Sequence, residues 1–255
     1  MCLIALAWKA RGDLPLVVAA NRDEWRERPT EAAHWWPDHP EVFAGRDLRA
    51  GGTWMGVTRS GRFAAVTNFR DPSDKRSTAR SRGELVSSFL LASESPEAFL
   101  SRLTPHAPAY NGFNLIVGDR ESLWIYSSRE GVPRPSEPGV HALSNHVLDE
   151  PWPKVKRARI AMAEALRDED PHTRLETFLA DARPPTDDEL PDTGVGLGWE
   201  RRLGPPLIVG EDYGTRSSAF VAFDAQGRIT FRELTRDALG AVVSVTDNHN
   251  ERRAP

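Results

Sequence analysis

Short apolar runs separated by turn residues dominate the first third of the chain. Residues 3–8 and 16–20 flank one turn-like segment, and residues 54–58 and 63–68 flank another. Two apolar runs joined by a short polar turn predict an antiparallel hairpin. The runs show little alternation between apolar and polar positions, so we expect both faces of the sheet to be covered.

Helical spacing of apolar residues follows in two pairs of segments. In the first pair, Ser95 is expected as the N-cap of the second helix and Pro96 as its first residue, because proline is well tolerated at that position. The second pair is separated by an acidic turn and Pro171. The helices are expected at residues 81–92, 95–103, 153–166 and 173–182.

Further strand patterns lie at residues 113–118, 123–127, 140–143, 217–223 and 229–233. Hairpins segregated from pairs of helices predict an α+β fold, in which the helices cover a sheet or a sandwich of two sheets. The segment 184–198, rich in Pro and Asp, is expected to be a loop. Residues 1–246 are expected to form one domain, and residues 247–255 a polar, disordered tail.

Composition narrows the class of protein without identifying its activity. Hydrophobic residues make up 39% and charged residues 27%, and the net charge of −4 gives no electrostatic reason to expect nucleic acid as a partner. No apolar run reaches membrane-spanning length, and the first residues lack the basic start of a signal peptide. A single cysteine cannot form an internal disulfide. We therefore expect a cytoplasmic protein without integral membrane association.

Common binding motifs are missing from the chain. The seven histidines and one cysteine form no metal-ligand pattern, and the P-loop, the nucleophile elbow and the c-type haem motif are absent. We expect no metal and no cofactor. The densest basic run, residues 154–159, has apolar neighbours at helical spacing, which favours a solvated helix face over a phosphate-binding patch.

Polar side chains gather where apolar runs end. The segment Asn-Arg-Asp-Glu at 21–24 directly follows one run, and Asn68 and Asn145 end two later ones. Each asparagine alone is typical of a turn at a strand end. Beside a nucleophile, however, an amide NH₂ can donate to an oxyanion, which is where acyl-transfer catalysis gains most.

Cys2 is the candidate nucleophile. Removal of Met1 would leave its thiol beside a free α-amine, and reference pKa values of about 7.7–8.0 for the amine and about 8.5 for the thiol make proton transfer between them nearly thermoneutral. Asp23 would orient the amine, and Arg22 or Arg216 would favour the thiolate. The alternative is that Cys2 is a small buried apolar residue on an internal strand.

Several motifs together resemble one protein family. The segment 21–24, after an N-terminal Met-Cys-Leu-Ile, is similar to the signature of the NRDE-motif family, also called the transport and Golgi organisation protein 2 family. Further similar motifs are Gly-Gly-Thr-Trp-Met-Gly at 51–56, Thr-Asn-Phe-Arg at 67–70, Asn-Gly-Phe-Asn-Leu at 111–115, Leu-Ser-Asn at 143–145 and Tyr-Gly-Thr-Arg-Ser-Ser at 213–218. The resemblance covers nearly the whole chain.

The resemblance implies an N-terminal nucleophile hydrolase fold, a four-layer αββα sandwich of two antiparallel sheets between helix layers. More remotely, the chain is similar to bile salt hydrolases and penicillin V acylases, which use an N-terminal cysteine to cleave non-peptide amide bonds. That likeness implies catalytic positions for Cys2, Asp23, Asn68 and Asn145, and Arg216 completes the expected catalytic set.

The arginines depart from the acylase pattern. The first acylase arginine falls at Ala20, and Arg22 stands two residues later. The late acylase arginine falls at Ala219, directly before Phe220, and Arg216 stands three residues earlier. The resemblance therefore implies the fold more firmly than the chemistry.

Two functions stay open. The first is a cysteine amidohydrolase that cleaves the C–N bond of a small linear amide. The second comes from the family, whose eukaryotic members have been linked to haem trafficking and to acyl-coenzyme A metabolism: a non-enzymatic carrier of haem or an acyl-coenzyme A. The residues expected to bind the small molecule are Asn21, Arg22, Glu24, Trp54 and Asn111.

Overall fold

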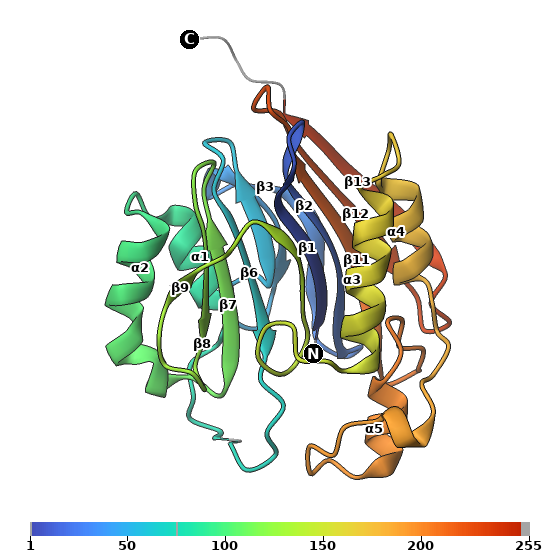
Figure 1. The fold of residues 1–255 in the computed structure, drawn as a ribbon. Coiled ribbons are helices and arrows are strands. Elements are labelled where there is room, and N and C mark those ends of the chain that lie inside the picture. The colour runs from blue at the N-terminus through green and yellow to red at the C-terminus, as the bar shows by residue number, and fades with distance from the viewer. Residues whose placement is uncertain (1, 75, 251–255) are drawn as a thin grey trace.

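Two antiparallel sheets stacked face to face form the centre of the protein, and helices cover the outer face of each (Figure 1). The computed structural model describes residues 2–74 and 76–250. The order of the layers is helices, seven-stranded sheet, six-stranded sheet, helices. This arrangement confirms the α+β sandwich that the sequence predicts.

The six-stranded sheet carries the start of the chain. Its order is β10 (Gly139–Leu143), β1 (Cys2–Arg11), β2 (Leu14–Trp25), β11 (Tyr213–Phe223), β12 (Ile229–Arg236) and β13 (Val242–Asn250). The seven-stranded sheet is built in chain order from β3 (Thr30–Trp36), β4 (His39–Asp47), β5 (Met55–Thr58), β6 (Phe63–Asn68), β7 (Phe113–Gly118), β8 (Leu123–Ser127) and β9 (Arg134–Pro135).

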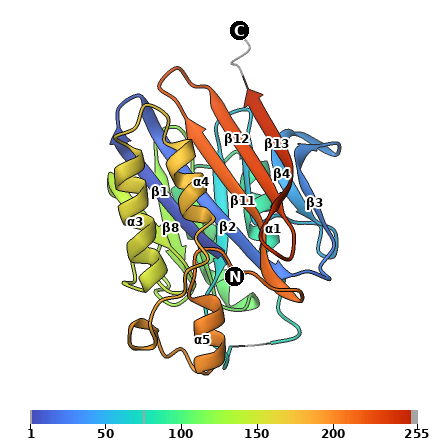
Figure 2. The ribbon, with the colours of Figure 1, turned by 90° about the vertical axis from the view of Figure 1, so that its right-hand side faces the viewer.

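The helices form the two outer layers. α1 (Gly83–Leu91) and α2 (Pro96–Leu103) pack on the seven-stranded sheet, whereas α3 (Pro153–Ala165) and α4 (His172–Leu179) lie across β1, β2 and β11 (Figure 2). As expected, the Ser95 side chain caps α2 by accepting a hydrogen bond from the Ala98 N–H. None of the helices in the described part of the chain has the length and apolar character that a membrane crossing requires.

Alternation of side chains along β1 and β2 decides which residues reach the space between the sheets. Ile4 on β1 and Val18 and Ala20 on β2 belong to the core between the sheets, whereas Leu3 and Ala19 face the helix layer. Two-residue periodicity therefore places Cys2 and Arg22 on the inner face. It places Asn21 and Asp23 on the helix-facing side.

Four strands of the described sheets were not expected from the sequence: β3, β4, β9 and β13. β3, β4 and β13 carry many polar residues because each has a partly exposed face. β13 also corrects the predicted tail, because residues 247–250 pair with β12. Residues 251–255 lie outside the described residues. Within the predicted loop 184–198, the structure has a short 3₁₀ turn at Asp187–Glu189 and the start of α5 (Leu197–Leu203).

Candidate active site

A cavity of about 460 Å³ opens at the end of the sandwich where β1 begins. Its wall includes Cys2, Arg22, Asp23 and Asn68. Four of the residues selected from sequence thus meet at one hollow, although they come from three strands. Gly52 of the 51–56 motif packs closely on the start of α1, because a Cβ at this position would lie 2.5 Å from the Gly83 carbonyl carbon.

Cys2 lies at the inner-face end of β1, directly opposite Arg22 on β2. The residue is 7% exposed and lines the cavity. Burial raises the pKa of the Cys2 thiol, and the charge of Asp23 acts in the same direction. The charge of Arg22 and a hydrogen bond from the Asp23 backbone N–H lower it. The resting side chain is therefore a thiol that needs a local base.

Arg22 occupies the position of a cation beside that thiol. Because Ala20 and Arg22 are two residues apart, both face the inside of the sandwich, so the displaced arginine keeps the same side of the sheet. Arg22 is 6% exposed, and its Nη1 has no hydrogen-bond partner among the described residues. Its charge also lowers the raised pKa of Glu233, a buried carboxyl on β12. Arg22 is thus a buried cation held at the cavity wall.

Asp23 lies at the opposite face of β2, one residue beyond the pair formed by Cys2 and Arg22. Its Oδ1 accepts a hydrogen bond of 2.7 Å from Thr215 Oγ1. This contact depends on a β-bulge at Arg216, where the register of β11 shifts between Thr215 and Ser217. The bulge turns the Thr215 side chain to the face that carries Asp23. The start of a chain lacking Met1 would lie beside this carboxyl.

Arg216 is not among the residues that line the cavity, and its side chain binds main-chain carbonyl groups. Its Nη1 donates to the carbonyl oxygens of Trp25, Arg26 and Arg28, at 3.0, 3.2 and 2.8 Å. These bonds fasten the segment after β2 to the bulge of β11. The structure therefore places Arg216 as a clamp on the main chain, and Arg22 as the arginine opposite the thiol.

The two asparagines have different positions. Asn68 lines the cavity, whereas Asn145 lies behind it and is fully buried. Asn145 Nδ2 donates to the Asn68 carbonyl at 2.9 Å, and the Asn145 carbonyl accepts from the Arg70 N–H at 2.7 Å. Ser144 Oγ donates to the Cys2 carbonyl at 3.2 Å. Asn145 thus holds the main chain around Asn68, and Asn68 is the amide that can meet a bound molecule.

The predicted binding residues also divide into two groups. Glu24, Trp54 and Asn111 line the cavity together with Arg22. Asn21 does not reach it, because its Nδ2 donates to the carbonyls of Leu179 and Pro206, both at 2.9 Å, on the helix-facing side. Asn21 therefore joins β2 to the layer of helices and loops that covers it.

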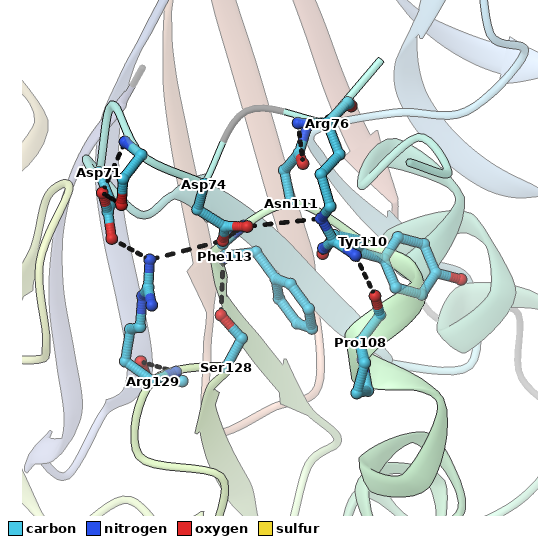
Figure 3. Close-up of polar contacts among 12 residues, drawn as sticks. Asp71, Asp74, Arg76, Pro108, Tyr110, Asn111, Phe113, Ser128 and Arg129 are labelled. Carbon is cyan, nitrogen blue, oxygen red and sulfur yellow. Dashed lines mark hydrogen bonds and ion pairs between the residues drawn. The ribbon is translucent and has the colours of Figure 1, made fainter. Parts of the chain in front are cut away.

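The segment after β6 forms another wall of the cavity and is fastened to its neighbours (Figure 3). Asn111 Oδ1 accepts from the Arg76 N–H at 3.0 Å, and Asn111 Nδ2 donates to the Arg76 carbonyl at 3.2 Å. The Arg76 guanidinium donates to the Pro108 carbonyl at 2.7 Å, and Arg129 donates to the Asp71 carboxylate. These hydrogen bonds hold the backbone of the segment that contributes Arg76, Arg80 and Arg82 to the cavity wall.

Arginine dominates the charges of the cavity wall. Most of these side chains are neutralised: Arg28, for example, lies 2.6 Å from Asp47. Arg82 differs, because its hydrogen bond goes to the Gly112 carbonyl at 3.0 Å. Excess positive charge is therefore concentrated at Arg22 and Arg82. The arginines of the wall are Arg22, Arg28, Arg46, Arg49, Arg76, Arg80 and Arg82, against the carboxylates of Asp23, Glu24 and Asp47.

A second cavity of about 580 Å³ adjoins the first. Trp25, Trp199 and Tyr213 form its aromatic part, with ring centroids 5.2 to 6.3 Å apart in edge-to-face arrangements. The two cavities share the wall made by Glu24, Asn68, Arg82 and Asn111. The site therefore has a cationic half and an aromatic half that meet near Asn68.

Sequence reasoning missed a buried group of charges next to the site. Arg70 Nη1 donates to Glu200 Oε2 at 2.6 Å, and the Arg70 guanidinium lies 4.7 Å from the Trp152 ring centroid. Lys154 is 3% exposed and donates to the Leu203 carbonyl at 3.0 Å. The predicted solvated face of residues 154–159 is therefore wrong at Lys154, which begins the inner face of α3. Helical spacing separates it from its exposed neighbour Lys156, because Lys154 lies four and eight residues before the buried Ala158 and Met162.

The chemistry available at the site is that of a thiol, carboxylates, amides and arginines. Among the described residues, no group of three or more His, Cys, Asp or Glu side chains is arranged to hold a metal ion. A thiol, a buried carboxylate, an amide and a cation therefore define the chemistry that this cavity offers.

Comparison with known proteins agrees with the motifs. Residues 1–238 match the family model described as Transport and Golgi organisation 2. The chain is 34% identical to the Transport and Golgi organization protein 2 homolog of Bos taurus, over 94% of each chain. It is 32% identical to the homolog of Mus musculus, over 91% of this chain and 92% of the relative.

Two solved structures resemble the chain at low sequence identity. One is the C2A mutant of conjugated bile acid hydrolase from Clostridium perfringens, with a TM-score of 0.44, 8% identity and coverage of 98% of this chain and 92% of that chain. The other is the N-acylethanolamine-hydrolyzing acid amidase ortholog of Caenorhabditis elegans, with a TM-score of 0.38, 11% identity and coverage of 86% and 92%. On the family model and the identities to its relatives, the chain belongs to the transport and Golgi organisation 2 family.

Proposed function

We propose that the protein is an N-terminal cysteine amidohydrolase that cleaves the C–N bond of a small linear amide. The observation that carries this proposal is the position of Cys2, whose thiol lines a cavity with Arg22 opposite it and Asn68 on the same wall. The charge of Arg22 lowers the pKa of the Cys2 thiol, which favours the thiolate that a nucleophile needs.

The reaction needs Met1 to be removed. The free α-amine of Cys2 then takes the thiol proton, and the sulfur attacks the amide carbonyl carbon to form a C–S bond. Asn68 donates to the resulting oxyanion, and the amine passes its proton to the leaving nitrogen as the C–N bond breaks. Water then attacks the thioester, releasing the carboxylic acid and restoring the thiol. Atoms and protons balance without a cofactor.

Asp23 and Arg22 divide the electrostatic work in this scheme. Asp23 favours the ammonium form of the amine after it has taken the proton, because an opposite charge raises the pKa of an amine. Arg22 favours the thiolate, which is the attacking species. Asn145 acts one step away, through its hydrogen bond to the Asn68 carbonyl.

The test is covalent labelling of the thiol. Because Cys2 is the only cysteine, one adduct in an intact-mass spectrum identifies the labelled residue. Purified protein lacking Met1 is expected to form one thioester with an activated amide or lactam probe, and Cys2→Ala to form none. Retention of Met1 in protein that turns over the probe would refute the free-amine mechanism.

A second candidate function is non-enzymatic binding of haem or an acyl-coenzyme A. The observation that favours it is that a cationic cavity adjoins an aromatic one. In the first cavity, Arg22 and Arg82 form no ion pair with a carboxylate among the described residues. The aromatic side chains of the second cavity are those of Trp25, Trp199 and Tyr213. Such a site suits an anionic ligand with a flat or apolar part.

Titration of the Cys2→Ala protein with haem and with an acyl-coenzyme A separates the two functions. Saturable binding tighter than about 10 μM, close to 7 kcal/mol, would support the carrier function. Arg22→Gln should weaken that binding, whereas Arg228→Gln in the turn between β11 and β12 is the matched control. Absence of saturable binding would refute the carrier function.

A further inference from the structure

β13 ends the six-stranded sheet and has a hydrogen-bonded neighbour on one side only. Residues 244–250 pair in regular antiparallel register with residues 229–235 of β12. Within the described residues, no strand and no backbone hydrogen bond occupies the other edge of β13. The N–H and C=O groups along such an edge form a template on which a further strand can pair.

The other three ends of the two sheets are protected against such pairing. At β10, the Ala142 N–H donates to the Asp149 carboxylate at 2.8 Å, and the Ala142 carbonyl accepts from the Asp149 N–H at 2.9 Å. In β3, two register shifts fall within seven residues, and the Ala33 N–H donates to Glu233 Oε1 at 2.8 Å. β9 has two residues, one of which is Pro135.

β13 has few of these protective features. It is nine residues long and contains neither proline nor lysine, the two residues that commonly block edge pairing. Its one register shift lies at its start, before Ser244. Figure 2 shows α4 over β2 and β11, while β12 and β13 have no helix in front of them. The free edge of β13 is therefore accessible along most of its length.

Exposed apolar side chains gather on β13 and on the turn before it. Leu239 is 79% exposed, and Val243 and Val245 are 60% and 47% exposed. Val245 pairs with Leu234, which belongs to the helix-facing core, so Val245 lies on the outer face of the sheet. Asp237 Oδ1 accepts from the Leu239 N–H at 2.9 Å and holds the turn that displays Leu239. A contiguous exposed apolar patch of this kind marks an interaction site.

We propose that β13 is the interface through which two copies of this chain associate, by antiparallel pairing of β13 with β13 of a second copy across a two-fold axis at Val245. This pairing joins the two six-stranded sheets into one continuous sheet. The inference concerns assembly and holds for either function proposed above. The match to the family model ends at residue 238, and β13 follows it.

The side chains of β13 favour a second copy as the occupant of this edge. Directly opposite residues of an antiparallel pair lie on the same face, so two-fold pairing brings the apolar patch against its own copy. With the axis at Val245, the two Val245 side chains meet on the outer face. On the inner face, Ser244 lies opposite Thr246 of the second copy, and hydroxyl pairs of this kind are favourable across strands.

The charges of β13 also permit the approach of a second copy. Asp247 is the only Asp, Glu, Lys or Arg on the strand, and its carboxylate lies 3.2 Å from Arg232 of the same chain. With the axis at Val245, Asp247 lies opposite Val243 of the second copy, so like charges do not face each other directly. None of the residues that line the two cavities of the candidate site lies on β13. The dimer therefore leaves the Cys2 cavity open.

Sedimentation equilibrium tests the interface. Over about 1 to 100 μM wild-type protein, the measured mass is expected to rise toward twice the 28.4 kDa of the chain. Val245→Lys places two ammonium groups opposite each other and should weaken association by about tenfold or more. Ile160→Lys is the matched control, because Ile160 is a similarly exposed apolar residue on α3, and it should associate like wild type.

Cross-linking tests the same register without a destabilising charge. In Cys2→Ala/Val245→Cys the two introduced thiols face each other across the axis, and opposite Cα atoms about 4.5–5.5 Å apart lie within disulfide range. Mild oxidation is expected to give a disulfide-linked dimer. The control Cys2→Ala/Ile160→Cys is expected to give none.

Three results would overturn the inference. The first is a wild-type protein that stays monomeric at the highest concentration, whether or not a strand from another protein then binds the edge. The second is a dimer that Val245→Lys weakens no more than Ile160→Lys does. The third is a dimer in which Val245→Cys cross-links no better than Ile160→Cys, a result that decides the matter even if Val245→Lys does not fold.

Discussion

Arg22→Met is the substitution that most directly perturbs the proposed nucleophile. Arg22 and Cys2 are directly opposite residues of two antiparallel strands, a geometry that brings Cβ atoms to about 4.5–5.5 Å. Both side chains are buried at the cavity wall, so water screens their interaction only in part. Methionine keeps the unbranched apolar stem of the side chain and removes the charge.

The size of the effect follows from Coulomb's law. At a charge separation of about 6 Å and an effective dielectric constant of about 20, the interaction is about 3 kcal/mol, or about 2 pKa units. Water in the cavity reduces this value, and we expect the thiol pKa to rise by about 1–2 units. The alkylation rate of Cys2 at pH 7 should then fall by about 10- to 100-fold.

The assay is the pH dependence of iodoacetamide alkylation, compared among wild type, Arg22→Met and Arg22→Lys. Arg22→Lys keeps the charge and should recover most of the wild-type rate. Denaturant unfolding of each variant shows whether the comparison is made on folded protein. An Arg22→Met profile that matches wild type would mean that Arg22 does not act on the thiol, and the assignment of the displaced arginine would fail.

Three further substitutions test other parts of the structure. Arg216→Gln removes hydrogen bonds to the backbone and should lower the free energy of unfolding, measured in urea, by about 2–3 kcal/mol. The pH dependence of Cys2 alkylation should stay unchanged. A shifted pH dependence would mean that Arg216 acts on the thiol. Asn145→Ala should cost about 1–3 kcal/mol and slow acylation of Cys2, because the Asn68 main chain loses its support; full acylation would contradict this. The hydrogen bond to Asp149 raises the pKa of His141, so this pair stabilises the fold below about pH 6.5 and less as pH rises through the folded pKa. His141→Gln should therefore reduce the melting temperature more at pH 6 than at pH 9, and an equal loss at both would contradict the linkage.

The strands and helices with strong periodicity could be predicted from the sequence. Residues 63–68, 113–118 and 123–127 were bounded correctly, because apolar runs of that length between turn residues leave few alternatives. β3 and β13 could not be predicted, because each is an edge strand that buries only one face, and its sequence therefore looks like a polar segment. Their assignment depends on partners distant in the chain, which single-sequence periodicity does not contain.

The part of the site that could be predicted consists of reactive or polar residues placed at the ends of apolar strands. Cys2, Asp23 and Asn68 lie together because the start of β1 and the end of β2 in one sheet meet the end of β6 from the facing sheet at one end of the sandwich. The sequence left open whether Arg22 or Arg216 lies beside the thiol, because that choice depends on the register of β2 and on a bulge in β11. Lys154 was missed because lysine is rarely buried, although its spacing from Ala158 and Met162 places it on the apolar face of α3.

The central claim is that Cys2 becomes the chain terminus and acts as the nucleophile. One intact-mass experiment on purified wild-type protein, before and after treatment with an activated amide or lactam probe, tests it directly. We expect a starting mass lacking Met1 and a single added acyl group that is absent from Cys2→Ala. Protein that keeps Met1, or that gains the same acyl group in Cys2→Ala, would contradict the claim.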